Sequence, residues 1–128
     1  MSTSQNLELF SGEAGSAVLI YRFVVRAADG QYDHVGVAQG DSDGVAAESQ
    51  AVVSASLPIV AMKGGTIAKC EAGAAVSALD VVSSDASGRA ITHVSGAGNY
   101  RLGKALDAAG AAGEIIRVQL SRELDEVT

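Results

Sequence analysis

Several residue types that build common functional sites are scarce in this sequence. Tryptophan is absent from its 128 residues, aromatic residues make up 4%, and there is one proline and one cysteine. The lone Cys70 cannot form a disulfide within the chain, and a single thiol does not make a metal site. The small number of aromatic rings argues against a sugar-binding or cell-binding module.

Targeting and membrane signals are also missing. No apolar run approaches the roughly 18 residues that a membrane-spanning helix needs. The first ten residues, MSTSQNLELF, lack the basic start and the apolar stretch of a signal peptide. We therefore expect a soluble protein that is made in a reducing cytosol and has no membrane partner.

Positive charge is scarce as well. The chain has 9 basic and 15 acidic residues, a net charge of −6 and an isoelectric point near 4.7. No cluster of Lys or Arg along the sequence offsets the acidic balance, and phosphate backbones repel such a surface. We expect no nucleic-acid partner.

What is abundant favours β structure. Hydrophobic residues make up 48% of the chain, mostly Ala and Val, and 15 glycines supply turns. Short strands separated by turn signals are typical of a small barrel or sandwich. The strands are expected at residues 17–25, 31–39, 51–55, 57–62, 66–70, 78–83, 89–94, 100–106 and 114–120. The predicted fold class is all-β, a single small domain of antiparallel strands.

The chain divides into three parts by composition. Residues 1–16 are polar and predict an extended N-terminal arm, in which Leu7, Leu9 and Phe10 form one apolar group. Residues 17–120 are expected to form the β domain. Residues 121–128 are charged and predict a tail that frays. No internal repeat is evident.

One glycine-rich segment partly matches a phosphate-binding loop. Gly98, Gly103 and Lys104 fit the pattern G-x-x-x-x-G-K-[ST], but Ala105 replaces the hydroxyl residue that binds magnesium. The pattern also needs a following helix, whereas residues 100–106 predict a strand. A glycine turn that enters a strand is the better interpretation.

Residues 61–63 (AMK) resemble the acceptor tripeptide of biotin-carrier domains, in which the lysine lies at an exposed hairpin of a small barrel. Gly64 stands where such domains have Met, and Val60 stands where an acidic residue is expected. A carrier modified at Lys63 is therefore a minor alternative.

The two histidines, His34 and His93, have no spacing that places metal ligands together. A Ser-His-Asp triad needs only proximity in space, but no G-x-S-x-G motif supports one. Asp41, Asp43 and Glu48 lie in one polar loop where calcium is conceivable, although the EF-hand pattern is absent. We predict no catalytic residue, no metal and no cofactor.

The pattern as a whole resembles the capsid cement, or head-decoration, proteins of tailed bacteriophages. The likeness is distributed over residues 17–120 and is weakest over 40–60. It is carried by the Asp29-Gly30 turn and by residues 34–38, 73–82, 87–90, 102–106 and 111–120, and the last two of these segments are the most specific.

The resemblance implies a structural virion protein rather than an enzyme. It implies a protein made in the host bacterial cytoplasm that binds the major capsid protein on the outer capsid surface as a homotrimer and stabilises the expanded head. A tail or baseplate β-module is the main alternative. We further hypothesise that Leu7, Leu9 and Phe10 bind the shell by strand addition; a neighbouring subunit is the other candidate for that contact.

Overall fold

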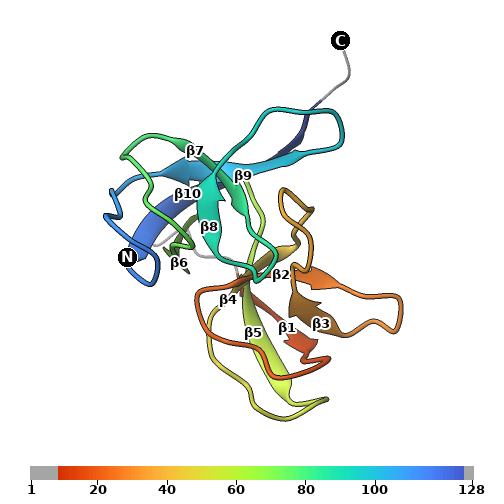
Figure 1. Cartoon of the computed structure of the whole chain (residues 1–128). Helices are drawn as coiled ribbons and strands as arrows, with labels where there is room; N and C mark the ends of the chain where they lie inside the picture. Colours follow the sequence, from red (N-terminus) through yellow and green to blue (C-terminus); the bar gives the residue numbers. More distant parts are fainter. Residues whose placement is uncertain (1–8, 126–128) are drawn as a thin grey trace.

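The computed structural model describes residues 9–125 and consists of two five-stranded sheets. In each sheet every pair of neighbouring strands is antiparallel. The first sheet has the order β1-β5-β4-β2-β3, and the second has the order β6-β10-β9-β7-β8. Figure 1 shows that each sheet occupies its own half of the molecule. The strands are β1 Leu9–Glu13, β2 Phe23–Arg26, β3 Tyr32–His34, β4 Gly44–Ala46, β5 Ser56–Ala61, β6 Ile67–Glu71, β7 Val81–Ser84, β8 Ala90–Thr92, β9 Tyr100–Ala105 and β10 Ile115–Leu124.

The prediction of an all-β, sandwich-like domain of short antiparallel strands is confirmed, because no helix occurs between residues 9 and 125. Accordingly, no helix in this part of the chain is long and apolar enough to cross a membrane.

The second sheet repeats the first, so the expectation of no internal repeat was wrong. Strands β6 to β10 follow β1 to β5 in the same order and the same spatial arrangement. Local details repeat too: a parallel bridge joins Ala14 to Tyr32 and another joins Ala72 to Ala90. In the turn that follows β2 and in the one that follows β7, Gly30 and Gly88 have φ values of 85° and 82°. We call residues 9–62 the first copy and residues 67–124 the second copy.

The two copies bury equivalent positions with side chains of different size. The first copy has its own core around Leu57 and Ile59, on which Phe10 and Tyr32 pack. The equivalent positions in the second copy are Ile116, Val118, Ala68 and Ala90, all of which are buried. The aromatic residues of the first copy are thus replaced by alanines in the second. The sequence nevertheless carries a trace of the repeat, because residues 13–18 (EAGSAV) and the equivalent residues 71–76 (EAGAAV) are nearly identical.

The other face of the first sheet packs against the second copy. Phe23, Val45 and Val60 are buried and belong to the same hydrophobic cluster as Leu102 and Leu120 of the second copy. The two sheets therefore share one core in addition to the smaller core of the first copy.

Three expected elements differ from the structure. The strand expected at residues 17–25 is limited to β2, because Tyr21 has a positive φ of 68° that an extended strand cannot contain. The polar loop at 40–50 contains β4, and residues 51–55 contain no strand.

The structure does not confirm an N-terminal arm separate from the domain over the described residues. Leu9–Glu13 form β1, the edge strand of the first sheet, and pair with β5. At the other end, β10 continues to Leu124, so residues 121–124 of the expected tail belong to the second sheet.

Candidate functional site

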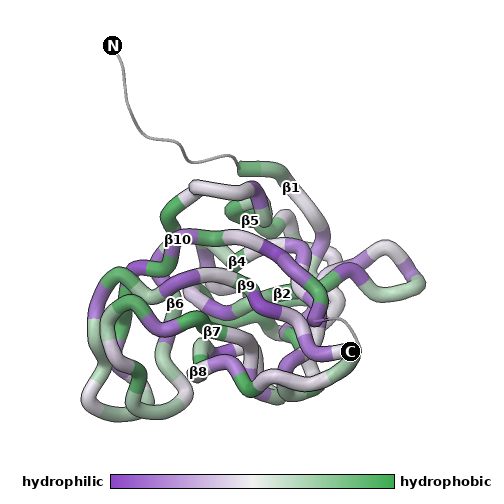
Figure 2. Tube along the Cα trace, turned by 90° about the horizontal axis from the view of Figure 1, so that it is seen from above, coloured by the Kyte–Doolittle hydropathy of each residue, from purple (hydrophilic) through white to green (hydrophobic). Residues whose placement is uncertain are grey.

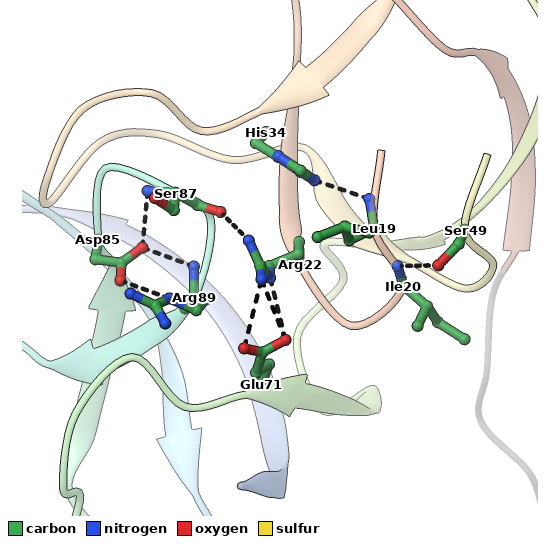
Figure 3. Close-up of polar contacts among 9 residues, drawn as sticks. All are labelled: Leu19, Ile20, Arg22, His34, Ser49, Glu71, Asp85, Ser87 and Arg89. Carbon is green, nitrogen blue, oxygen red and sulfur yellow. Dashed lines mark hydrogen bonds and ion pairs between the residues drawn. The ribbon is translucent and has the colours of Figure 1, made fainter. Parts of the chain in front are cut away.

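The junction between the two copies is held by an ion pair that is largely shielded from solvent. The Arg22 guanidinium donates to both carboxylate oxygens of Glu71 at 3.3–3.4 Å, and the exposed fractions of the two side chains are 13% and 22%. Arg22 also donates to the Ser87 carbonyl at 3.0 Å, as Figure 3 shows. The backbone N–H of Glu71 donates to the Tyr21 carbonyl at 2.9 Å. One arginine of the first copy thus binds two segments of the second.

Asp85 fixes the turn that receives this arginine. Its carboxylate accepts hydrogen bonds from the backbone N–H groups of Ser87 and Arg89 at 2.8 and 2.9 Å, and from the Arg89 guanidinium at 3.2 Å (Figure 3). This local pattern is an Asx-type turn, which orders a loop without burying apolar area. The turn presents the carbonyls of Ser87 and Gly88 to the first copy.

His34 lies near the same junction and has a structural contact. Its Nε2 accepts a hydrogen bond from the Leu19 backbone N–H at 2.9 Å. Partial burial, and then the positive charge of Arg22, lower the pKa of His34. A neutral imidazole that accepts from the backbone fits both effects, and this contact holds the loop before β2.

His93 links a serine and a carboxylate, but the arrangement differs from that of a hydrolase. Ser83 Oγ lies 2.5 Å from His93 Nδ1, and Asp125 Oδ2 lies 2.7 Å from His93 Nε2. In a serine-hydrolase triad the serine bonds to Nε2 and the aspartate to Nδ1. Here these partners are exchanged, and Ser83 is completely buried. A substrate therefore has no access to this hydroxyl.

The hydrogen-bonding pattern explains what the His93 cluster does. Ser83 donates its hydroxyl hydrogen to the Tyr100 carbonyl at 2.6 Å, so His93 Nδ1 must act as the donor to Ser83. Nε2 faces the Asp125 carboxylate at 2.7 Å. Asp125 also accepts from Arg101 at 2.8 Å. The cluster fastens residue 125, part of the tail expected to fray, to the second sheet.

In the loop considered for calcium, two of the carboxylates lie beside an arginine of β10. Arg122 lies 3.3 Å from Asp41 and 3.7 Å from Asp43, and Glu48 is exposed. Among residues 9–125 no group of three or more His, Cys, Asp or Glu side chains gathers in a way that could hold a metal.

The two lysines considered as functional residues lie in unsuitable places for those functions. Lys104 lies within β9, on a strand that no helix follows in the described chain. Lys63 lies in the connection between β5 and β6, which belong to different sheets, so it is not at the tip of a hairpin.

The arm residues have separate environments. Leu9 is 58% exposed at the edge strand β1. Phe10 packs on the core of the first copy, with its ring centroid 5.7 Å from that of Tyr32. Leu7 lies outside the described residues. Phe10 and Tyr32 also line an open groove of about 700 Å³ with Arg26 and Arg122.

Sequence reasoning missed a basic surface on the second sheet. Alternating residues of β6, β10, β9 and β7 place one group of exposed side chains side by side on the outer surface of this sheet, and we call this group the basic face. Its members are Ile67, Lys69, Val81, Lys104, Arg117 and Gln119. The alternation within residues 66–70 and 114–120 was visible in the sequence, but only the strand order brings three separate cations together.

Comparison with known proteins agrees with this architecture. A protein-family model described as "Phage cement protein" matches residues 13–120. Among solved structures, the chain is similar to the N base of the head fiber protein gp8.5 of bacteriophage phi29, with a TM-score of 0.71 and 18% identity over 94% of this chain and 99% of that one. At this identity the likeness shows the fold alone. No curated protein matches the sequence.

The match spans most of the chain and defines a class, the structural proteins of the phage virion that bind the capsid. The chain belongs to the phage cement protein family. The resemblance inferred from the sequence is thereby confirmed.

Proposed function

We propose that this protein binds the major capsid protein on the outer surface of the expanded head, as a homotrimer assembled from chains made in the host cytoplasm. The observation that carries the proposal is the family match over residues 13–120. A ligand that binds the expanded shell and not its disrupted form stabilises the shell by mass action. Many copies on each particle multiply a modest stabilisation per contact.

This function needs no catalysis, and we propose that the chain has no enzymatic activity. The arrangement most similar to an active site, Ser83–His93–Asp125, is support for this view because its serine is buried and its ring nitrogens have exchanged partners. The cluster acts as a fastening for the end of β10.

The N-terminal residues are proposed to contribute to shell binding. The candidates are Leu7, Leu9 and Phe10, and of the two that the structure describes, Leu9 has a largely exposed side chain on an edge strand. Edge strands present unpaired backbone groups that a partner strand can use. Phe10 would support this contact from below by holding β1 on its core.

The experiment that tests the proposal uses heads of the phage that encodes this chain, assembled without the protein. Purified protein is added to expanded and to unexpanded heads, and bound protein is measured by cosedimentation. We expect saturable binding to expanded heads and a higher temperature of head disruption. Absence of binding to expanded heads would contradict the proposed function. Native mass measurement tests the trimer separately, since a monomer at all concentrations would contradict it.

The role of the arm is tested in the same assay with matched variants. Leu9→Ser should weaken binding, whereas Val52→Ser, which removes a similarly exposed apolar side chain of the first copy, should not. Thermal unfolding of both variants checks that the fold is kept. Equal binding by the two variants would show that Leu9 takes no part.

A further inference from the structure

The basic face is an unusual feature of an acidic protein. Three of the nine basic residues, Lys69, Lys104 and Arg117, lie on it, although the chain has a net charge of −6. Lys69 and Arg117 are directly opposite each other in the β6–β10 register. Like charges in opposite positions of neighbouring strands destabilise a sheet. The Lys69–Arg117 pair by itself therefore does not stabilise the sheet.

The charges on this face are only partly neutralised within the chain. Arg117 binds Asp107 with two contacts at 2.9 Å. Within residues 9–125, neither Lys69 nor Lys104 forms an ion pair. The nearest carboxylates along these strands are at the margin, where Glu71 is bound to Arg22 and Glu123 lies near Arg101. Two uncompensated ammonium groups thus face solvent beside Arg117.

The shape of the face also fits a protein partner. Ile67 and Val81 are 44% and 37% exposed and alternate with the cations. A groove of about 400 Å³ lies at one side of this face, where Val81, Lys104 and Gln119 line it together with Arg101 and Glu123. Figure 2 shows the alternation of hydrophilic and hydrophobic residues along β9 and β10. Apolar side chains between cations provide buried area in addition to charge, as protein interfaces do.

The repeat shows that this position of the fold can pack against another protein surface. In the first copy, the positions of Val81, Lys104 and Gln119 are occupied by Phe23, Val45 and Val60. Those three apolar residues are buried against the second copy. One copy thus uses this face for an internal contact, and the other copy leaves the same face exposed with its apolar residues largely replaced by polar and charged ones.

A second copy of this chain does not fit on the basic face in the geometry of the internal junction. The junction depends on Arg22 and Glu71, whose equivalents in the next such contact would be Asp80 and Glu13. Two carboxylates would then stand where an ion pair is needed, and this repulsion opposes head-to-tail stacking. The charges of the face instead complement a different surface that carries carboxylates.

From these observations we propose that the basic face docks an acidic surface of the capsid shell. Lys69 and Lys104 are its principal charge contacts, and Ile67 and Val81 supply the apolar contact between them. The inference rests on the proposed function and identifies which surface of the protein performs it. Binding of this kind is sensitive to salt, because exposed charges are screened over roughly 10 Å at 0.1 M salt.

The test measures cosedimentation with expanded heads over a series of NaCl concentrations for wild type, Lys69→Glu, Lys104→Glu and the control Arg26→Glu. Arg26 is exposed on the first sheet, so its reversal changes the net charge equally without touching the basic face. We expect each lysine variant to bind about tenfold more weakly or worse than wild type, with a reduced dependence on salt. Arg26→Glu should bind like wild type.

Three outcomes would overturn the proposal, and the first of them would do so without contradicting the proposed function. If the lysine variants bind heads like wild type, the basic face is not the docking surface while the proposed function stands. If all three variants lose binding equally, the effect is one of net charge alone. If the wild type itself fails to bind, the proposed function fails first. Thermal unfolding of each variant excludes misfolding as the cause of a loss.

Discussion

The backbone N–H of Phe23 donates a hydrogen bond of 2.7 Å to the carbonyl of Gly88. This contact joins the start of β2 in the first copy to the turn between β7 and β8 in the second copy. A Cβ atom at Gly88 would lie 2.7 Å from the Phe23 carbonyl oxygen. The same glycine position in the first copy, Gly30, meets only the end of the Arg26 side chain at 3.4 Å. The two equivalent turns therefore differ in how well they tolerate a side chain at the glycine, because only the Gly88 turn contacts the other copy.

We predict that Gly88→Ala is more destabilising than Gly30→Ala. Both substitutions place an L-residue at positive φ, which costs roughly 1–2 kcal/mol. Gly88→Ala adds a backbone clash worth about 1–3 kcal/mol. Urea unfolding of the two variants measures the difference. Equal losses of unfolding free energy would mean that the junction relaxes around the new Cβ atom at position 88 without destabilising the fold.

A pair of core positions should behave as a unit. Gly12 faces Tyr32 in the first copy, and a Cβ atom at Gly12 would lie 2.6 Å from the tyrosine ring. The second copy has the larger Cys70 beside the smaller Ala90 at these positions. We expect Gly12→Cys alone to destabilise by about 1–3 kcal/mol.

The double variant Gly12→Cys with Tyr32→Ala should lose less than the sum of the two single variants. Neighbours that share one space typically couple by about 0.5–3 kcal/mol in a double-mutant cycle. Chemical unfolding of all four proteins provides the cycle. If the losses of unfolding free energy are additive, the side chains at positions 12 and 32 are not coupled.

The junction ion pair should contribute more than an exposed pair. Arg22→Met leaves the carboxylate of Glu71 without its partner at a site that is largely shielded, and we expect a loss of about 2 kcal/mol. Arg122→Met removes contacts with Asp41 and Asp43 that are more open to solvent, and should cost less than about 1 kcal/mol. Thermal unfolding in low salt compares the two, and a greater loss for Arg122→Met would contradict the ranking.

Acid should loosen the end of β10. The hydrogen bond to His93 lowers the pKa of Asp125 to about 2, against an ordinary value of 3.8, and contacts with the Gly96 backbone and Arg101 act in the same direction. Because this pKa is lower in the folded state, the carboxylate stabilises the fold above about pH 4. That contribution decreases as pH falls toward 2.

The measurement is the melting temperature from pH 7 to pH 2 for wild type, Asp125→Asn and Asp107→Asn. The Asp107 carboxyl also has a pKa of about 2, because of Arg117, but it lies away from the His93 cluster. Both variants should start lower at pH 7 and lose less on acidification than wild type. An unchanged pH profile in Asp125→Asn would show that the cluster does not stabilise the chain.

The strands that the sequence predicted best are apolar or alternating runs bounded by clear turn signals. Residues 57–62, 66–70, 100–106 and 114–120 correspond closely to β5, β6, β9 and β10. β6 and β10 alternate between exposed and buried positions, whereas residues 57–62 are apolar throughout because Ile59 and Val60 are buried on opposite faces of β5. The strand predicted for residues 17–25 is too long, because the composition of this segment does not reveal the positive φ of Tyr21 that interrupts it. β4 is three residues long and is flanked by polar residues in the sequence, so its pattern is too short to recognise, although all three residues are buried.

The repeat and the basic face escaped sequence analysis for related reasons. Outside residues 13–18 (EAGSAV) and 71–76 (EAGAAV) the copies share few identities, and the partly buried Phe10 and Tyr32 are replaced by the buried Ala68 and Ala90, which changes the hydrophobic bulk. Lys69, Lys104 and Arg117 are distant in the sequence and meet only because β10 lies between β6 and β9. Strand order is a property of the whole chain, and no local pattern reveals it.

The head-to-tail contact between the copies has a consequence for growth. Units that join by unlike faces can extend without limit into filaments unless something ends the series. Here the series ends after two units, because the next contact would oppose Asp80 and Glu13 and would place Lys104 where Val45 is buried. The contact between the copies is therefore closed within one chain, and the equivalent face of the second copy stays exposed.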